Sequence, residues 1–193
     1  MNPQYGIIAP TGGFGNHIRH ICLLSKEFNL DLDKSKLDFF LEDVYPSNRN
    51  WQNWLNFDYK YKNTLSQYIN LQHHSRTDIS KTVFVNTNPE LCLHHYIKLN
   101  SQLNGLSIND HLYNLNKDTE FTKTFNYFEV DGDQFWNSTL PQNEYNKLIT
   151  FFGISNNYTE AQIIHTRWYE LHKSSEKDIG NWYLNFYNTS NSY

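Results

Sequence analysis

The chain has 193 residues, a length that predicts one domain with a substantial hydrophobic core and excludes two domains of ordinary size. Apolar residues make up 38% of the sequence and charged residues 19%, a composition typical of a folded domain and not of a disordered chain. The formal net charge is −4 and there is no run of Lys or Arg, so we expect no nucleic-acid partner and no binding to an anionic membrane surface.

The chain opens with a predicted strand, a glycine-rich turn and a helix. Tyr5–Ala9 is a short apolar run, and Pro10–Asn16 follows it with glycines that can adopt positive φ angles. Ile18, Ile21 and Ser25 then recur at the three- and four-residue spacing of a helix that buries one face.

Such a turn predicts an anion site, because backbone N–H groups converge at the start of a helix, where the helix dipole is positive. The candidate binding residues of this region are Thr11, Gly12, Gly13, Phe14, Gly15, Asn16 and Arg19. The alternative is a turn that only lets the strand reverse tightly into its helix. The sequence has neither Gly-Lys-Ser/Thr nor the G-x-G-x-x-G spacing, so it matches neither the standard nucleoside-triphosphate loop nor the dinucleotide fingerprint.

The next part of the chain predicts two strands separated by a helix and a loop. We expect strands at Leu37–Glu42 and Thr82–Val85. Ser47 caps a helix over Trp51–Leu65, whose tryptophans are expected to pack against the sheet; an aromatic platform for a ring substrate is the alternative. The polar segment His73–Arg76 is predicted to be a loop.

The pattern of strand and helix continues toward the C-terminus. Asn88 caps a helix that begins at Pro89 and ends before Gly105, and Ser107 caps a short helix after it. We expect a strand at Phe125–Val130 and then a helix that begins at Pro141 and is closed by Gly153.

A sustained period of three to four residues over Ala161–Phe186 predicts one long amphipathic helix. Its wide aromatic stripe either covers a face of the sheet or mediates self-association into a homo-oligomer. Strands and helices alternate along residues 1–193, which predicts a single α/β domain: a three-layer sandwich with a mainly parallel sheet and ligands at the carboxyl ends of its strands.

The sequence also bears on location and on metal binding. No stretch reaches the roughly 18 apolar residues that a membrane-spanning helix needs, and the N-terminus lacks the pattern of a signal peptide, so we expect a soluble, cytoplasmic protein. Cys22 and Cys92 fall on apolar helix faces and are predicted to be buried free thiols. No metal-ligand spacing is present, so we expect no metal site.

Three segments, taken in order, resemble the sulfotransferase family, which has a P-loop-like fold and uses the donor 3′-phosphoadenosine 5′-phosphosulfate. Ala9–His17 is similar to the loop that grips the 5′-phosphosulfate of the donor. Thr82–Pro89, with Ser107–Leu112, is similar to the strand and helix that hold the 3′-phosphate. Phe128–Asp131 and Tyr145–Ile154 are similar to the late strand and helix of the family.

The resemblance implies that Thr87, Asn88 and His95 bind the donor together with the glycine-rich turn. The sequence departs from the family at these positions: Thr87 stands where the family has an arginine, His94 or His95 stands where it has a serine, and the turn lacks the basic residue. Because fixed positive charges are the strongest partners of phosphate, we expect weaker affinity for the standard donor.

The activity implied by the resemblance is transfer of a sulfuryl group from the nucleotide donor to a hydroxyl or amine of a small-molecule or glycan acceptor. His17 is the first candidate for the general base and His20 the second, because histidine titrates near neutral pH. A surface or capping role is the alternative for each. Arg19 and the amides of the turn would stabilise the developing charge.

Two other functions remain open. Gly12–Asn16 also resembles the turn of fucosyltransferases that use GDP-fucose, which carry a later His-x-Arg, and His165–Arg167 has that form, although it lies within a predicted helix. The third hypothesis is a binding or assembly module on a transferase fold that has lost its donor site.

Overall fold

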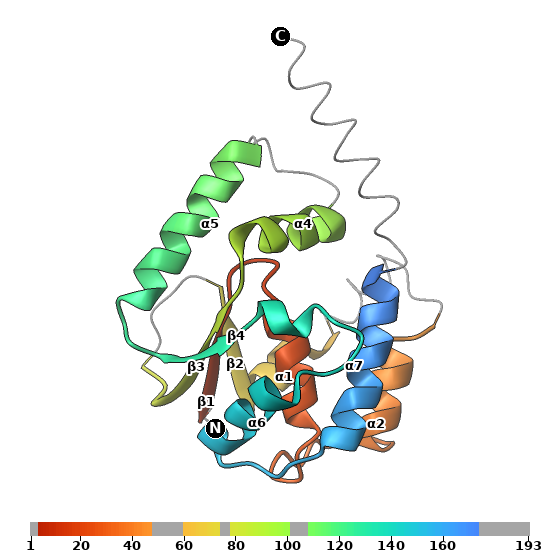
Figure 1. Cartoon of the computed structure of the whole chain (residues 1–193). Helices are drawn as coiled ribbons and strands as arrows, with labels where there is room; N and C mark the ends of the chain where they lie inside the picture. Colours follow the sequence, from red (N-terminus) through yellow and green to blue (C-terminus); the bar gives the residue numbers. More distant parts are fainter. Residues whose placement is uncertain (1–3, 48–59, 74–77, 101–107, 174–193) are drawn as a thin grey trace.

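The computed structural model of the protein describes residues 4–47, 60–73, 78–100 and 108–173 (Figure 1). Within these residues four strands form one sheet in the order β2-β1-β3-β4, and every neighbouring pair is parallel. The strands are β1 (Tyr5–Ile8), β2 (Ile69–Gln72), β3 (Lys81–Asn86) and β4 (Phe128–Asp131). The parallel sheet that the alternation of elements predicts is therefore confirmed.

Helices separate the strands along the chain. They are α1 (Gly15–Leu23), α2 (Lys36–Phe39), the π-helix η1 (Phe40–Val44), α4 (Pro89–Asn100), α5 (Ile108–Lys123), the 3₁₀-helix η2 (Asp133–Phe135), α6 (Gln142–Phe152) and α7 (Tyr158–Lys173). Residues 60–66 are also helical. Helices α1 and α6 pack on the sheet, α7 packs against α1 and η1, and α4 packs against α5. None of the helices in the described ranges is both long and apolar enough to cross a bilayer.

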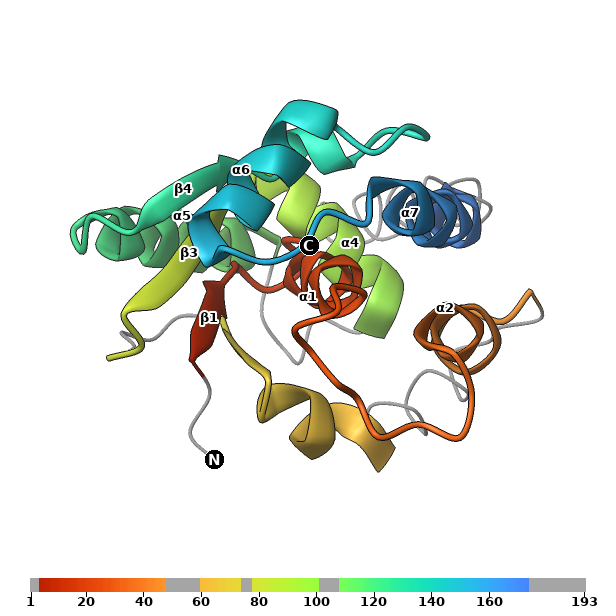
Figure 2. The ribbon, with the colours of Figure 1, turned by 90° about the horizontal axis from the view of Figure 1, so that it is seen from below.

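Both faces of the sheet are buried, which makes the architecture a layered α/β sandwich. Ile7 and Val83 point into the main core with the helices α1, α6 and α7, and both are fully buried. Their neighbours Ile8 and Phe84 point to the opposite face, because side chains alternate along a strand, and they are buried as well. Figure 2 shows α5 on the side of the sheet away from α1. Burial on both faces is the usual environment of a parallel sheet.

Helix α1 lies close against the sheet because its first residue is a glycine. A Cβ atom on Gly15 would come within 2.7 Å of the Cβ of Ala9 and 2.6 Å of Cδ1 of Leu71. Both distances are shorter than van der Waals contact. The third glycine of the turn is therefore required for the packing of α1 onto the strands β1 and β2.

The predicted strand at Leu37–Glu42 is wrong, because this segment forms α2 and η1. Ser35 caps it: its Oγ accepts a hydrogen bond from the backbone N–H of Asp38 at 3.1 Å. Ser35 and Asp38 form a Ser-x-x-acid capping pattern, which is visible in the sequence and indicates a helix. The apolar residues Phe39 and Phe40, which suggested a strand, instead join the main core.

Strand β2 was not predicted. It has only four residues, Ile69–Gln72, of which Ile69 is fully buried, and it lies at an edge of the sheet. A segment this short gives almost no periodic signal in the sequence.

The other predicted elements that lie in the described ranges are confirmed with shifted ends. The predicted short helix after Ser107 runs to Lys123, and the late strand begins at Phe128. Gly153 closes α6 at a φ of 70° as expected. The predicted long helix is described as far as Lys173, as α7. Positions 174–186 of that prediction and the tryptophans Trp51 and Trp54 lie outside the described residues.

Replacing Gly15 by alanine should destabilise the protein by about 1–3 kcal/mol, because the added methyl group meets Ala9 and Leu71. The sign of the change in stability is informative, since replacing glycine by alanine at an open helical position stabilises a protein by about 1 kcal/mol. Urea denaturation of Gly15→Ala measures the effect, and the double variant Ala9→Gly/Gly15→Ala should recover part of the loss. Equal or greater stability of the single variant would contradict the close packing.

Candidate functional site

The glycine-rich turn lies at the edge of the sheet where the parallel strands β1 and β3 both end. The N–H of Gly13 donates to the carbonyl oxygen of Pro10 at 2.8 Å, and Gly12, at the third position of this turn, has a φ of 85°. A positive φ at this position is why the turn needs glycine there. Thr11 and Gly12 are half-buried, so the tip of the turn faces partly outward.

Phe14 joins the turn to α1 in an unusual conformation. It is the N-cap residue of the helix and has a φ of 61°, in the left-handed region that residues with a Cβ rarely adopt. Its ring is buried and packs edge-on against His95 at 4.7 Å and Trp168 at 5.3 Å between ring centroids. Burial of the ring offsets the cost of the backbone conformation, which is of order 1–3 kcal/mol.

Phe14 belongs to a group of rings that we call the aromatic–histidine cluster. Its members come from α1, α4, the segment after η2, and α7: Phe14, His17, His95, Trp136, His165 and Trp168. The ring of His17 stacks on that of Trp168 with centroids 4.1 Å apart and an angle of 8° between the planes. His95 lies edge-on to Trp136 at 4.4 Å. Segments far apart in the sequence therefore meet beside the glycine-rich turn.

Two histidines of the cluster form a hydrogen-bonded chain. Nε2 of His165 lies 2.7 Å from the carbonyl oxygen of Asn137, which can only accept, so this nitrogen carries the proton. Nδ1 of the neutral ring is then an acceptor, and Nε2–H of His17, at 2.9 Å, donates to it. Nδ1 of His17 is left with a lone pair, and it has no hydrogen-bond partner among the described residues.

Burial keeps both histidines of the chain neutral. Loss of hydration lowers the pKa of His165 to about 4, against a smaller opposing effect of the Asn137 carbonyl. Burial also lowers the pKa of His17 well below its usual value, and the neighbouring His165, His20 and His172 lower it further. Neutral imidazole is the form that can accept a proton, but His17 is only 1% exposed.

The predicted second base, His20, lies three residues after His17 on α1. Its Nδ1 is 2.7 Å from the hydroxyl of Tyr45, which follows η1. The ring also lies 5.2 Å from that of Phe40. His20 is buried, and it joins α1 to the segment Phe40–Tyr45.

Arg19 lies just behind the turn and is almost completely buried, at 3% exposure. Its guanidinium donates to Oδ1 of Asn16 at 2.8 Å and to Oγ of Ser66 at 3.3 Å. Both of these partners are uncharged, and the two bonds orient the guanidinium. Asn16 is half-buried and connects Arg19 to the start of the helix.

The second predicted binding segment follows β3. Thr87 is buried and packs against Gly132, whose absent Cβ would lie 2.0 Å from the Thr87 hydroxyl oxygen. Oδ1 of Asn88 accepts from the N–H of Glu90 at 2.8 Å and so caps α4, as predicted. The backbone N–H of Asn88 donates to the carboxylate of Asp133 at 2.8 Å. A carboxylate of the protein itself therefore lies at the start of α4, where the resemblance implies a phosphate.

The structure thus brings some predicted residues together and separates others. Phe14 contacts His95 across the two segments, and Arg19 contacts Asn16 within the first. Thr87 and His20 are each buried against other elements. Trp136 and Trp168 were not predicted as site residues; Trp168 was assigned only to an apolar helix stripe, and no pattern in the sequence distinguishes Trp136.

The chain matches no protein-family model, no curated protein and no solved structure. The resemblance to sulfotransferases therefore rests on the quoted residues, and the function is a matter of proposal. Within the described residues, no group of three or more His, Cys, Asp or Glu side chains is arranged to hold a metal ion.

The protein should lose stability in mild acid. Because the folded state lowers the pKa of His17 and His165, it binds fewer protons than the unfolded state, so stability is complete above about pH 6.5 and falls as the pH drops toward 4. From His165 alone, the free energy of unfolding should be about 2 kcal/mol lower at pH 5 than at pH 7. Urea denaturation across this range measures the slope. The variant His165→Gln should be less stable at pH 7 and show a shallower dependence; parallel curves would contradict the assignment.

The hydrogen-bonded chain also predicts which nitrogen of each ring carries the proton. Both His17 and His165 should be Nε2–H tautomers, because the Asn137 carbonyl fixes His165 and His165 fixes His17. Nitrogen-15 chemical shifts of the two rings at pH 7 distinguish the tautomers. A proton on Nδ1 of His17 would mean that the chain runs in the opposite direction.

Proposed function

We propose that the protein is a sulfotransferase-like transferase that binds a nucleotide donor at the carboxyl edge of its sheet. One observation carries this proposal: β1 and β3 are parallel neighbours, so the glycine-rich turn and the segment Thr87–His95 lie at the same edge. Phe14 from the first segment contacts His95 from the second. These are the two segments that the resemblance assigns to the two ends of 3′-phosphoadenosine 5′-phosphosulfate.

The first segment supplies the chemistry for an anion. The half-buried tip of the turn leads into α1, a helix of nine residues, whose first N–H groups and dipole favour negative charge. Arg19, which Asn16 orients, adds a positive charge behind the turn. We assign the 5′-phosphosulfate to this segment. The second segment is the weaker one, because Asp133 adds a negative charge beside the start of α4.

The proposed reaction is in-line displacement at sulfur. The oxygen or nitrogen of the acceptor forms a bond to sulfur while the bond from sulfur to the phosphate oxygen breaks, and adenosine 3′,5′-bisphosphate leaves. A base takes the proton of the acceptor. His17 is the candidate for this base through Nδ1, the nitrogen that keeps its lone pair. Because His17 is buried and stacked on Trp168, against which Phe14 also packs, an acceptor reaches Nδ1 only if these rings rearrange.

A second candidate function has a specific observation in its favour. The two segments that resemble fucosyltransferases are the turn Gly12–Asn16 and His165–Arg167. The structure brings them together, because His165 is hydrogen-bonded to His17, which directly follows the turn. A donor with a diphosphate, such as a GDP-sugar, would use the same amides and Arg19.

Calorimetric titration with adenosine 3′,5′-bisphosphate and with GDP distinguishes these functions. Saturable binding of adenosine bisphosphate supports the sulfotransferase-like function, and preferential binding of GDP supports a sugar transferase. Binding of neither overturns both and leaves the binding or assembly module.

Arg19 is the side chain on which donor affinity should depend most. Arg19→Met keeps the length of the buried chain but removes the charge, and it should weaken binding about 10- to 100-fold, the usual effect of losing a charged hydrogen bond. Lys117→Met removes one positive charge from the exposed surface of α5 and is the matched control. Thermal unfolding of each variant checks the fold. Equal affinity of the two variants would remove Arg19 from the site.

A further inference from the structure

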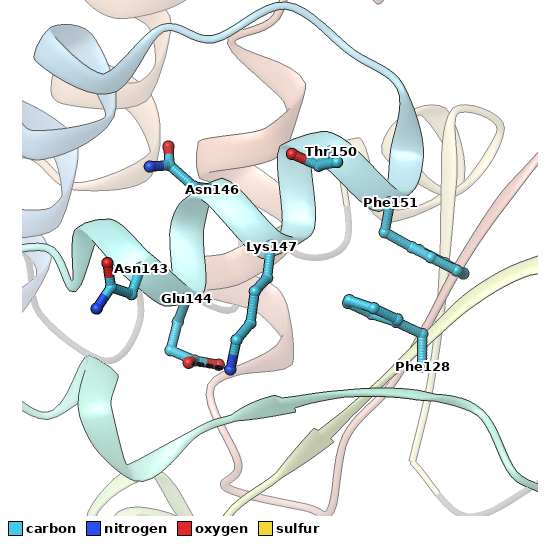
Figure 3. Close-up of a pocket in the computed structure, with 7 residues that line it drawn as sticks. All are labelled: Phe128, Asn143, Glu144, Asn146, Lys147, Thr150 and Phe151. Carbon is cyan, nitrogen blue, oxygen red and sulfur yellow. Dashed lines mark hydrogen bonds and ion pairs between the residues drawn. The ribbon is translucent and has the colours of Figure 1, made fainter.

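A groove of about 760 Å³ lies between α6 and β4. It is lined by Phe128, Asn143, Glu144, Asn146, Lys147, Thr150 and Phe151. Figure 3 shows Glu144 and Lys147 pointing from α6 toward β4, with the rings of Phe128 and Phe151 face to face at one end. None of these residues belongs to the aromatic–histidine cluster, so the groove is distinct from the proposed donor site.

One wall of the groove is the outer edge of the sheet. In the order β2-β1-β3-β4, only β3 pairs with β4 within the described residues. The N–H of Gly132 donates to Asn86 of β3 at 2.8 Å, whereas the N–H of Asp131 donates to the carboxylate of Glu144 at 2.8 Å. Since the N–H and C=O groups of alternate residues in a strand point to the same side, Glu129 also presents both groups to the outer side.

The carboxylate of Glu144 takes the place that a neighbouring strand would occupy. It accepts the outward N–H of Asp131, and it is held there by Lys147 at 2.5 Å. Two residues earlier, the N–H and C=O of Glu129 have no hydrogen-bond partner among the described residues. An open pair of this kind at a sheet edge is the recognition element for an added strand.

The groove also has separate surfaces for alternating side chains. On the α6 side, Phe128 and Phe151 stack with centroids 4.3 Å apart, and Phe128 is 37% exposed. On the opposite side of the strand, the carboxylates of Glu129 and Asp131 belong to exposed residues. Successive side chains of an added strand would meet an aromatic surface and then an acidic one.

We propose that this groove binds an extended peptide that pairs with Glu129 as a strand outside β4. The peptide alternates apolar residues, which pack on Phe128 and Phe151, with Lys or Arg, which face Glu129 and Asp131. The same acidic side chains disfavour a second copy of β4, because like charges would lie opposite each other.

The probe is a synthetic peptide that alternates valine with lysine, titrated into the nitrogen-15-labelled full chain and followed by amide chemical shifts. The expected result is saturable shifts at Phe128–Asp131 and along α6. A peptide with glutamate in place of lysine should bind more weakly. No saturable shift at about 1 mM peptide, a limit that corresponds to negligible affinity, overturns the proposal.

Two variants at one position separate strand pairing from charge. Glu129→Ala removes the carboxylate, and Glu129→Pro removes the carboxylate and the outward N–H while leaving the bonds to β3 intact. Glu129→Pro should bind the peptide about tenfold more weakly than Glu129→Ala, as expected for one lost hydrogen bond. Equal affinities of the two variants for the peptide would overturn the proposal. So would chemical-shift changes that map away from the groove, or displacement of the peptide by a neutral oligosaccharide. Dimerisation of the free chain through this edge would overturn it as well.

Discussion

The hydrogen bond between His17 and His165 joins the start of α1 to the middle of α7; it requires a neutral His165, whose Nδ1 accepts, and burial keeps both imidazoles neutral. The bond sits under the stacked ring of Trp168, away from water, where an unpaired or charged ring is costly. Phe14 packs on the same tryptophan, and that packing holds the left-handed backbone at the end of the glycine-rich turn. The geometry of the proposed donor site therefore depends on this packing as well as on the glycines of the turn.

This dependence limits the chemistry of the site. A turn followed by a helix provides amides for an anion, yet Gly13, Phe14 and Gly15 are buried, and in this stretch only Thr11, Gly12 and Asn16 are partly exposed. Arg19 adds charge from behind, and its bond to Asn16 links that charge to the turn. After β4, Asp133 of η2 places a carboxylate at the start of α4. The two ends of a nucleotide would consequently meet opposite electrostatic environments, one favourable and one unfavourable.

The sheet has a second surface of interest along its β4 edge. The groove beside β4 and the turn after β1 use different properties of the same sheet: the turn lies where parallel strands end, whereas the groove lies along a strand that has no outer neighbour among the described residues. Glu144 closes part of that border with a side chain, which is a common way to protect a sheet edge. The part that remains open is the backbone of Glu129.

Local patterns in the sequence were enough to predict a parallel α/β sheet, the glycine-rich turn and the caps at Asn88 and Gly153. They failed at Leu37–Glu42, where an apolar run outweighed the capping pattern of Ser35 and Asp38, and at β2, which is too short for a periodic signal. Caps and turns are predictable because their hydrogen bonds join residues only two to four positions apart.

Only the tertiary structure decided which residues share a site. His17 and His165 are separated by 148 positions, and no spacing rule connects them. The protonation of each ring follows from burial and from the Asn137 carbonyl, which are properties of the packed structure. The sequence by itself determined that a helix begins after a glycine-rich turn, since that is a local backbone property. Whether the histidines near it face solvent or a ring depended on which distant segments fill the space beside α1, because desolvation and ring packing arise only when those segments meet.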